Sequence, residues 1–130
     1  MNPKKDIENR DDIKLLVDSF YKKVLSNKYI GFIFKDVAKI KLIEHMPKMY
    51  DFWESTLLRA NSYRGNPMMI HMDLHNKTLL KKEHFDEWLR LFNETVSELF
   101  HGETAELAKT RALSIATVMQ IKISQLDQNL

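Results

Sequence analysis

Apolar residues recur along most of this chain with the period of an α-helix, and that period restricts the possible fold more than any other feature. Four stretches have apolar side chains at spacings of three and four residues, which place them on one face of a helix. These stretches cover residues 13–25, 43–57, 85–100 and 105–126. No stretch alternates convincingly as a half-buried strand does. The sequence therefore predicts an all-α protein with four amphipathic helices.

Turn-forming residues are scarce, which agrees with long helices. The 130 residues include only three glycines and three prolines, few for a β protein with many tight turns. Asp11 or Asp12 is the expected N-cap of the first helix. The fourth stretch is rich in alanine, so another helix can approach it closely. Because no repeat or linker divides the chain, we predict one domain over residues 1–130, in which residues 1–11 form a polar, loosely ordered N-terminal extension.

Composition and charge exclude several classes of protein. The chain is 44% hydrophobic and 29% charged, as in a packed protein, and its net charge of +2 gives little reason to expect binding to nucleic acid or to an anionic membrane. It has no cysteine, which excludes disulfides, thiolate catalysis and cysteine-ligated zinc or iron–sulfur sites. No apolar run approaches the roughly 20 residues of a membrane span. The N-terminus is too polar for a signal peptide, so we expect a cytoplasmic protein.

A histidine lies in the one region of weak periodicity, residues 63–80. A turn signal, Gly65-Asn66-Pro67, opens this region, and His71 follows among Met68, Met69, Ile70 and Met72. A buried histidine needs a partner, because burying an unpaired polar group is costly. That partner is either a backbone carbonyl or a bound ligand, and this segment alone does not decide between them.

Polar groups also interrupt the apolar faces of three predicted helices. His45 shares a face with Leu42, Met49 and Phe52, Tyr21 lies on the first apolar stripe, and Trp88 lies on the third. Each has an ordinary explanation alone, since a Tyr or Trp on a helix stripe is usually a core residue with its polar atom at the surface. Together with His71 they place a polar group on the inward side of four segments. A ligand in a shared cavity would satisfy all of them.

Five runs of sequence, taken together, resemble the group III truncated haemoglobins. They are FYKKVLSNKYIGFIF, EHMPKMYDFWESTLL, YRGNPMMIHMDL, HFDEWLRLFNETVSELF and RALSIA. The resemblance covers roughly residues 13–119, nearly the whole chain. The glycine pairs that mark other truncated-haemoglobin groups are absent, since the chain has only Gly31, Gly65 and Gly102. This resemblance implies a two-over-two α-helical sandwich around a b-type haem.

The resemblance also assigns roles at the iron. His71, within GNPMMIH, matches the proximal iron ligand, and its second ring nitrogen can donate to a backbone carbonyl and fix the ring orientation. On the distal side, Tyr21 matches the tyrosine that faces bound ligand, His45 matches the distal histidine, and Trp88 matches a tryptophan whose indole N–H reaches the pocket.

Further residues match or suit the surroundings of the haem. Phe34 matches a phenylalanine that packs against it, and the apolar lining expected beside it consists of Phe20, Met49, Phe52 and Trp53. The haem propionates are expected to meet Lys48, with Tyr63 or Arg64 as further partners. The alternative is that these basic and hydroxyl groups contact only solvent, as such groups near helix ends commonly do.

Two local features qualify this assignment. Pro47 follows His45 closely, so the helix either begins near Pro47 or is kinked there, and His45 is expected to swing in and out of the pocket. His75 lies four residues after His71, a spacing that zinc sites use, but no third ligand or HExxH motif accompanies the pair. His84 and His101 are expected at the surface or at helix ends.

The hydrogen-bond donors of the distal side predict the function. Tyrosine O–H and indole N–H groups stabilise partial negative charge on a bound diatomic ligand and slow its release. The first hypothesis is therefore a haem protein that binds dioxygen, with nitric oxide and carbon monoxide as further ligands. The alternatives are a redox enzyme that acts on peroxide or nitric oxide with electrons from an unidentified reductase, a ligand sensor, and a haem-free helical interaction module.

Overall fold

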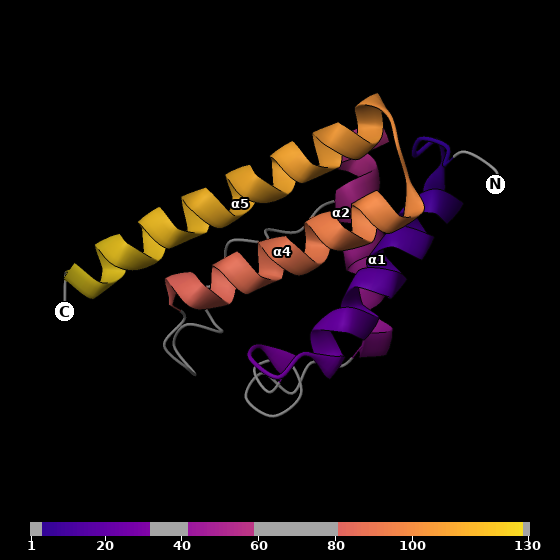
Figure 1. Cartoon of the computed structure of the whole chain (residues 1–130). Coiled ribbons are helices and arrows are strands. Elements are labelled where there is room, and N and C mark those ends of the chain that lie inside the picture. Colours follow the sequence, from indigo (N-terminus) through magenta and orange to yellow (C-terminus); the bar gives the residue numbers. More distant parts are fainter. Residues whose placement is uncertain (1–3, 32–41, 59–80, 129–130) are drawn as a thin grey trace.

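The computed structural model describes residues 4–31, 42–58 and 81–128, and all its regular structure is helical (Figure 1). The helices are α1 (Arg10–Ser26), α2 (Leu42–Leu58), α4 (Lys82–Leu99) and α5 (Glu103–Gln128). No strand occurs in this part of the chain. The prediction of an all-α protein is confirmed.

These four helices form two pairs, α1 with α2 and α4 with α5, and one pair packs against the other. Helices α4 and α5 run side by side after a short connection, while α1 packs against α2 and also against α4 (Figure 1). Helix α2 in turn contacts α5. This arrangement is the expected two-over-two sandwich, and it places the inner faces of all four helices around one core.

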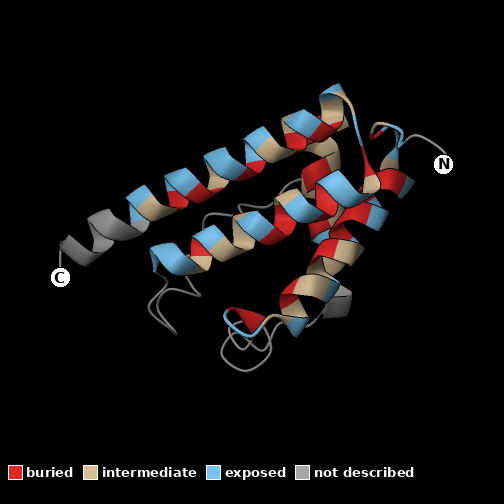
Figure 2. Cartoon of the chain, viewed as in Figure 1, coloured by how far each residue is buried: buried red, intermediate tan, exposed pale blue. Residues whose placement is uncertain are grey.

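The core consists of the apolar stripes that the sequence predicts. Buried positions follow the inner face of each helix (Figure 2). The largest fully buried side chains include Ile13, Leu16, Ile30, Phe92 and Met119. The alanines of α5 are buried too: Ala105, Ala108, Ala112 and Ala116. As expected, small residues on α5 accompany the close packing of α4.

The start of α1 differs from the expectation. Asn9 is the N-cap, and its side-chain oxygen accepts a hydrogen bond from the backbone N–H of Asp12 at 3.0 Å. The expected cap at Asp11 or Asp12 is therefore wrong by two or three residues. Asp12 instead lies inside the first turn, where its carboxylate accepts from the N–H of Glu8 at 2.9 Å and from Lys5 Nζ at 2.7 Å.

The segment before α1 is attached to the far end of the chain. The carboxylate of Asp6 accepts hydrogen bonds from the backbone N–H groups of Thr104 at 2.9 Å and Ala105 at 2.8 Å, so it caps α5. Burial opposes the charge on Asp6, but these donors outweigh that effect and lower its pKa. Ile7 is 2% exposed. In residues 4–11 the polar extension is thus more firmly bound than its composition predicts.

Gly102 makes this cap sterically possible. Its φ is +139°, a conformation that L side chains rarely adopt, and a Cβ at this position would lie 2.6 Å from the Asp6 carboxyl group. The turn between α4 and α5 therefore needs glycine. Across the described residues, no helix is long and apolar enough to cross a lipid bilayer.

Candidate functional site

The inner faces of α1 and α2 bring two of the predicted distal residues into direct contact. The hydroxyl of Tyr21 lies 2.7 Å from Nε2 of His45. Their rings meet edge to face, with centroids 5.3 Å apart and planes at 81°. Burial raises the pKa of Tyr21 far above its ordinary value, so the phenol keeps its proton at neutral pH. The tautomer of His45 decides which of the two side chains donates.

An aromatic cluster connects this pair with Trp88. The ring of Phe20 makes edge contacts with Tyr21 at 5.5 Å, Trp88 at 5.6 Å and Phe92 at 5.2 Å between centroids. Phe92 stacks on Trp53 at 4.8 Å and on Trp88 at 5.9 Å. Tyr21 and Trp88 are therefore neighbours of one phenylalanine, although they belong to different helix pairs. Three helices contribute to this cluster, with hydroxyl, imidazole and indole groups at its edge.

The other predicted lining residues fall into two groups. Met49 and Trp53 are buried in the core, Phe52 packs against it, and Lys48 is exposed. Phe34, Tyr63, Arg64 and His71 lie outside the described residues, as does His75. The roles assigned to those residues remain predictions. His84 is a helix-end residue, since its Nδ1 accepts from the backbone N–H of Lys81 at 3.0 Å, and His101 is exposed just after α4.

Pro47 lies inside α2 rather than at its start. The helix begins at Leu42 and continues through Pro47, so His45 belongs to its first turn. A proline cannot donate to the carbonyl of the residue four positions earlier, here Ile43, and its ring crowds that carbonyl. The turn that carries His45 thus has one backbone hydrogen bond fewer than a regular helix.

A row of polar contacts continues from the Tyr21–His45 pair along the α1–α2 interface. The hydroxyl of Tyr50 donates a hydrogen bond to Asp18. Arg10 forms ion pairs with Asp51 and Glu54, each at 2.9 Å. Sequence reasoning missed these residues, because pattern analysis detects apolar periodicity and the partners Asp18 and Tyr50 are 32 residues apart.

The chemistry that the described residues offer around Tyr21 and His45 is hydrogen bonding within an apolar cluster. The described residues contain no group of three His, Asp or Glu side chains that could hold a metal ion by itself. They do provide a largely apolar cluster in which a hydroxyl and an imidazole lie at hydrogen-bond distance from each other. This combination fits the open side of a haem pocket, where apolar groups cover the porphyrin and a few donors face the ligand.

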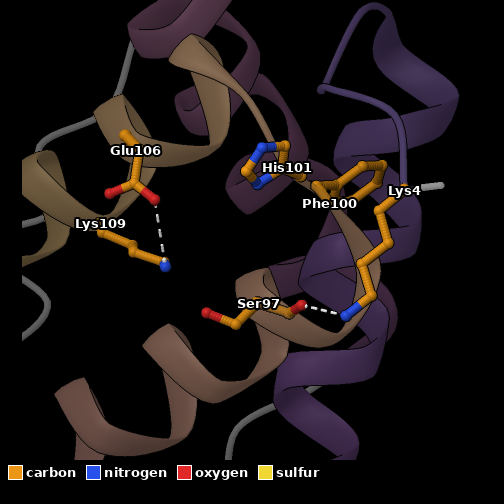
Figure 3. Close-up of a pocket in the computed structure, with 6 residues that line it drawn as sticks. All are labelled: Lys4, Ser97, Phe100, His101, Glu106 and Lys109. Carbon is orange, nitrogen blue, oxygen red and sulfur yellow. Dashed lines mark hydrogen bonds and ion pairs between the residues drawn. The ribbon is translucent and has the colours of Figure 1, made fainter.

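A separate hollow of about 240 Å³ lies near the junction of α4 and α5 (Figure 3). It is lined by Lys4, Ser97, Phe100, His101, Glu106 and Lys109. Both lysines already contact oxygen atoms: Lys4 donates to the carbonyl of Ser97 at 2.6 Å, and Lys109 lies 3.4 Å from Glu106. None of the distal residues lines this hollow, so it is not part of the same site.

Comparison with known proteins assigns the chain to a protein family. The family model of the bacterial-like globins matches residues 6–123. This span covers nearly the whole chain, and the chain belongs to that family. Membership implies a haem-binding protein.

Individual relatives show which group of this family the chain resembles. The chain is 32% identical over 115 residues to the group 3 truncated haemoglobin ctb of Campylobacter jejuni, an alignment that covers 86% of this chain and 88% of the relative. The crystal structure of the group III truncated haemoglobin from Campylobacter jejuni matches with a TM-score of 0.80 and 30% identity, over 93% of this chain and 95% of that one. The resemblance to group III truncated haemoglobins is confirmed.

Proposed function

We propose that the chain binds dioxygen and related diatomic gases at a b-type haem whose iron is held by His71. The observation that carries the proposal is the contact between Tyr21 and His45, beside Trp88, in an otherwise apolar cluster. A haem held by one histidine supplies an iron atom with an open position for a gas. The residues described above supply hydrogen bonds and exclude water.

Tyr21 is the principal donor in this proposal. It stays protonated at neutral pH because burial raises its pKa. When His45 Nε2 carries a proton and donates to the phenol oxygen, the phenol proton can point at the ligand. When Nε2 is unprotonated, the phenol donates to His45 instead. The His45 tautomer therefore selects between a donor aimed at the ligand and a donor held by the protein.

Trp88 is the second donor. Its ring is packed by Phe20 and Phe92, which fixes the direction of its indole N–H. Because Tyr21 and Trp88 would address one small ligand, Trp88→Phe and Tyr21→Phe should each speed dioxygen release, and the double variant should be non-additive.

His45 acts as a gate in this proposal. It lies in the turn weakened by Pro47, so it can leave Tyr21 at lower cost than a residue inside a regular helix. His45→Leu should change the association rate of the gas more than the dissociation rate. A large rise in dissociation with unchanged association would show that His45 itself holds the ligand.

Haem binding and iron ligation are tested directly. Titration of the purified protein with haemin, followed by Soret absorbance, should show saturable uptake of one haem per chain, and its absence would refute the proposal. His71→Gly should lose the iron–histidine signature and regain a five-coordinate ferrous spectrum when imidazole is added. If the variant keeps the original spectrum without imidazole, another residue is the ligand.

A further inference from the structure

We infer that Asp18 and Tyr50 are positioning residues, whose hydrogen bond sets the alignment of α1 against α2 and thereby holds Tyr21 in contact with His45. This inference rests on the proposed function, in which that contact controls the donor offered to the gas. Neither residue touches the ligand in this account. They act through the helices that carry the two distal side chains.

The spacing along both helices supports this role. Asp18 precedes Tyr21 by three residues on α1, which is slightly less than one helical turn. Tyr50 follows His45 by five residues on α2, and its hydroxyl reaches back to Asp18. The Asp18–Tyr50 bond is thus the next polar link along the interface from the Tyr21–His45 pair. The Arg10 ion pairs lie further away, at the other end of α1.

The position of Pro47 makes this link important. Pro47 lies between His45 and Tyr50, and it removes one of the backbone hydrogen bonds that would hold the first turn of α2. A side-chain link to a neighbouring helix three residues after the proline compensates for that loss. The hydrogen bond to Asp18 fixes Tyr50 against α1. The preceding residues of α2, including His45, are therefore held at a defined position relative to α1.

The surroundings of Tyr50 keep its hydroxyl a donor and its ring in place. Burial, followed by the hydrogen bond to Asp18, raises the pKa of Tyr50 to about 12. The Lys14 ammonium lies 5.8 Å and the Arg10 guanidinium 6.0 Å from the centre of the Tyr50 ring. These cations still contact the ring when the hydroxyl is removed. Tyr50→Phe therefore isolates the hydrogen bond from the packing of the ring.

The test measures the Tyr21–His45 contact itself. The imidazole ¹⁵N chemical shifts of His45 report its tautomer and its hydrogen bond. They are measured in the protein before and after haemin is added. Tyr50→Phe should move the Nε2 shift away from the wild-type value. It should also raise the association rate of carbon monoxide by roughly two- to tenfold, the change that corresponds to one net hydrogen bond. Asp18→Ala should reproduce both effects, whereas Asp18→Asn, which keeps an oxygen acceptor, should restore most of the wild-type behaviour.

Two controls separate positioning from general stability. Tyr29→Phe removes the hydroxyl of a tyrosine that is 72% exposed and should leave the His45 shifts unchanged. Asp6→Ala removes the cap of α5, which contacts Thr104 and Ala105, and should lower stability without moving those shifts. The inference is overturned if Tyr50→Phe and Asp18→Ala leave the His45 shifts at their wild-type values, or if Asp6→Ala moves them equally. Since the shifts are also read without haem, a failure to bind haem would refute the proposed function and still leave this test decisive.

Discussion

The two helix pairs of this protein are joined by different chemistry. Between α4 and α5, buried alanines and apolar side chains such as Phe85 and Met119 fill the interface. Between α1 and α2, a row of hydrogen bonds and ion pairs runs beside the apolar core, from Arg10 to the Tyr21–His45 pair. The α4–α5 interface depends on how closely apolar side chains fit together. The α1–α2 interface depends also on hydrogen bonds and ion pairs, which form only in particular orientations. In the proposed function these two helices align donors with a small ligand, and directional contacts favour that alignment.

Phe92→Ala should have the largest effect on stability, because it removes the side chain on which the two helix pairs meet. Phe92 is fully buried and contacts Phe20 and Trp53 across the sandwich. Truncation of a buried phenylalanine costs about 3–5 kcal/mol. Denaturant unfolding monitored by circular dichroism measures this loss. Leu113→Ala, at a position 55% exposed on α5, is the matched control and should stay within about 0.5 kcal/mol of wild type.

Ala116→Leu tests whether the α4–α5 interface depends on small residues, because Ala116 clusters with Phe85 of α4. Ala116 is buried, and added volume in a well-packed core costs about 1–3 kcal/mol. Ser114→Leu adds similar bulk to the exposed face of α5 and should cost much less. Equal stability of both variants would show that α4 and α5 are not closely packed, and the contrast between the two interfaces would fail.

Asp6 links the N-terminal segment to α5 and should make stability depend on pH. Its folded pKa is lowered, so its contribution is complete above the ordinary pKa of an aspartate, near 4, and is lost as the pH falls through the lowered value. Asp6→Ala should cost about 0.5–2 kcal/mol at pH 7, as for other helix caps, and little at low pH. Unfolding of both proteins across the acid range measures this difference. An undiminished difference at acid pH would contradict the role of the charged carboxylate.

The ion pairs of Arg10 should have the smallest effect and the clearest dependence on salt. The guanidinium is partly exposed, so its pairs with Asp51 and Glu54 should contribute about 0.2–1 kcal/mol. Arg10→Gln should lower stability by that amount in dilute buffer and by less in 1 M salt. The Ala116→Leu penalty should not shrink in this way. If both respond alike to salt, the interfaces do not differ as described.

The apolar faces of the helices could be predicted from the sequence, because they depend on local periodicity. Contacts between residues far apart in the chain could not. The stripes of Ile13, Phe92 and Ala108 lie on the inner faces of the predicted helices, because a repeat of three and four residues specifies one face of a helix. Tyr21, His45 and Trp88 could be selected because each interrupts such a face. Asn9 was missed as a cap, since Asp11 and Asp12 have equally suitable side chains and only the helix start distinguishes them.

Long-range polar contacts carry no periodic signal. Asp6 and Thr104 are 98 residues apart, and Asp18 and Tyr50 are 32 apart. Nothing in the local sequence of either partner indicates the other. His71, the predicted iron ligand, and Phe34, Tyr63 and Arg64, the predicted haem contacts, lie outside the described residues, so these roles stay predictions.

The release of dioxygen and of carbon monoxide from Tyr21→Phe tests the central claim most directly. A hydrogen bond to a charged acceptor is worth about 1.5–3 kcal/mol, so its loss should speed dioxygen release by on the order of ten- to a hundredfold. Bound carbon monoxide carries less negative charge, and its release should change far less. Stopped-flow measurement of both dissociation rates, in wild type and variant, gives the comparison. If both gases leave faster by the same factor, or if neither rate changes, Tyr21 does not hold the ligand by a hydrogen bond and the account of the distal site is contradicted.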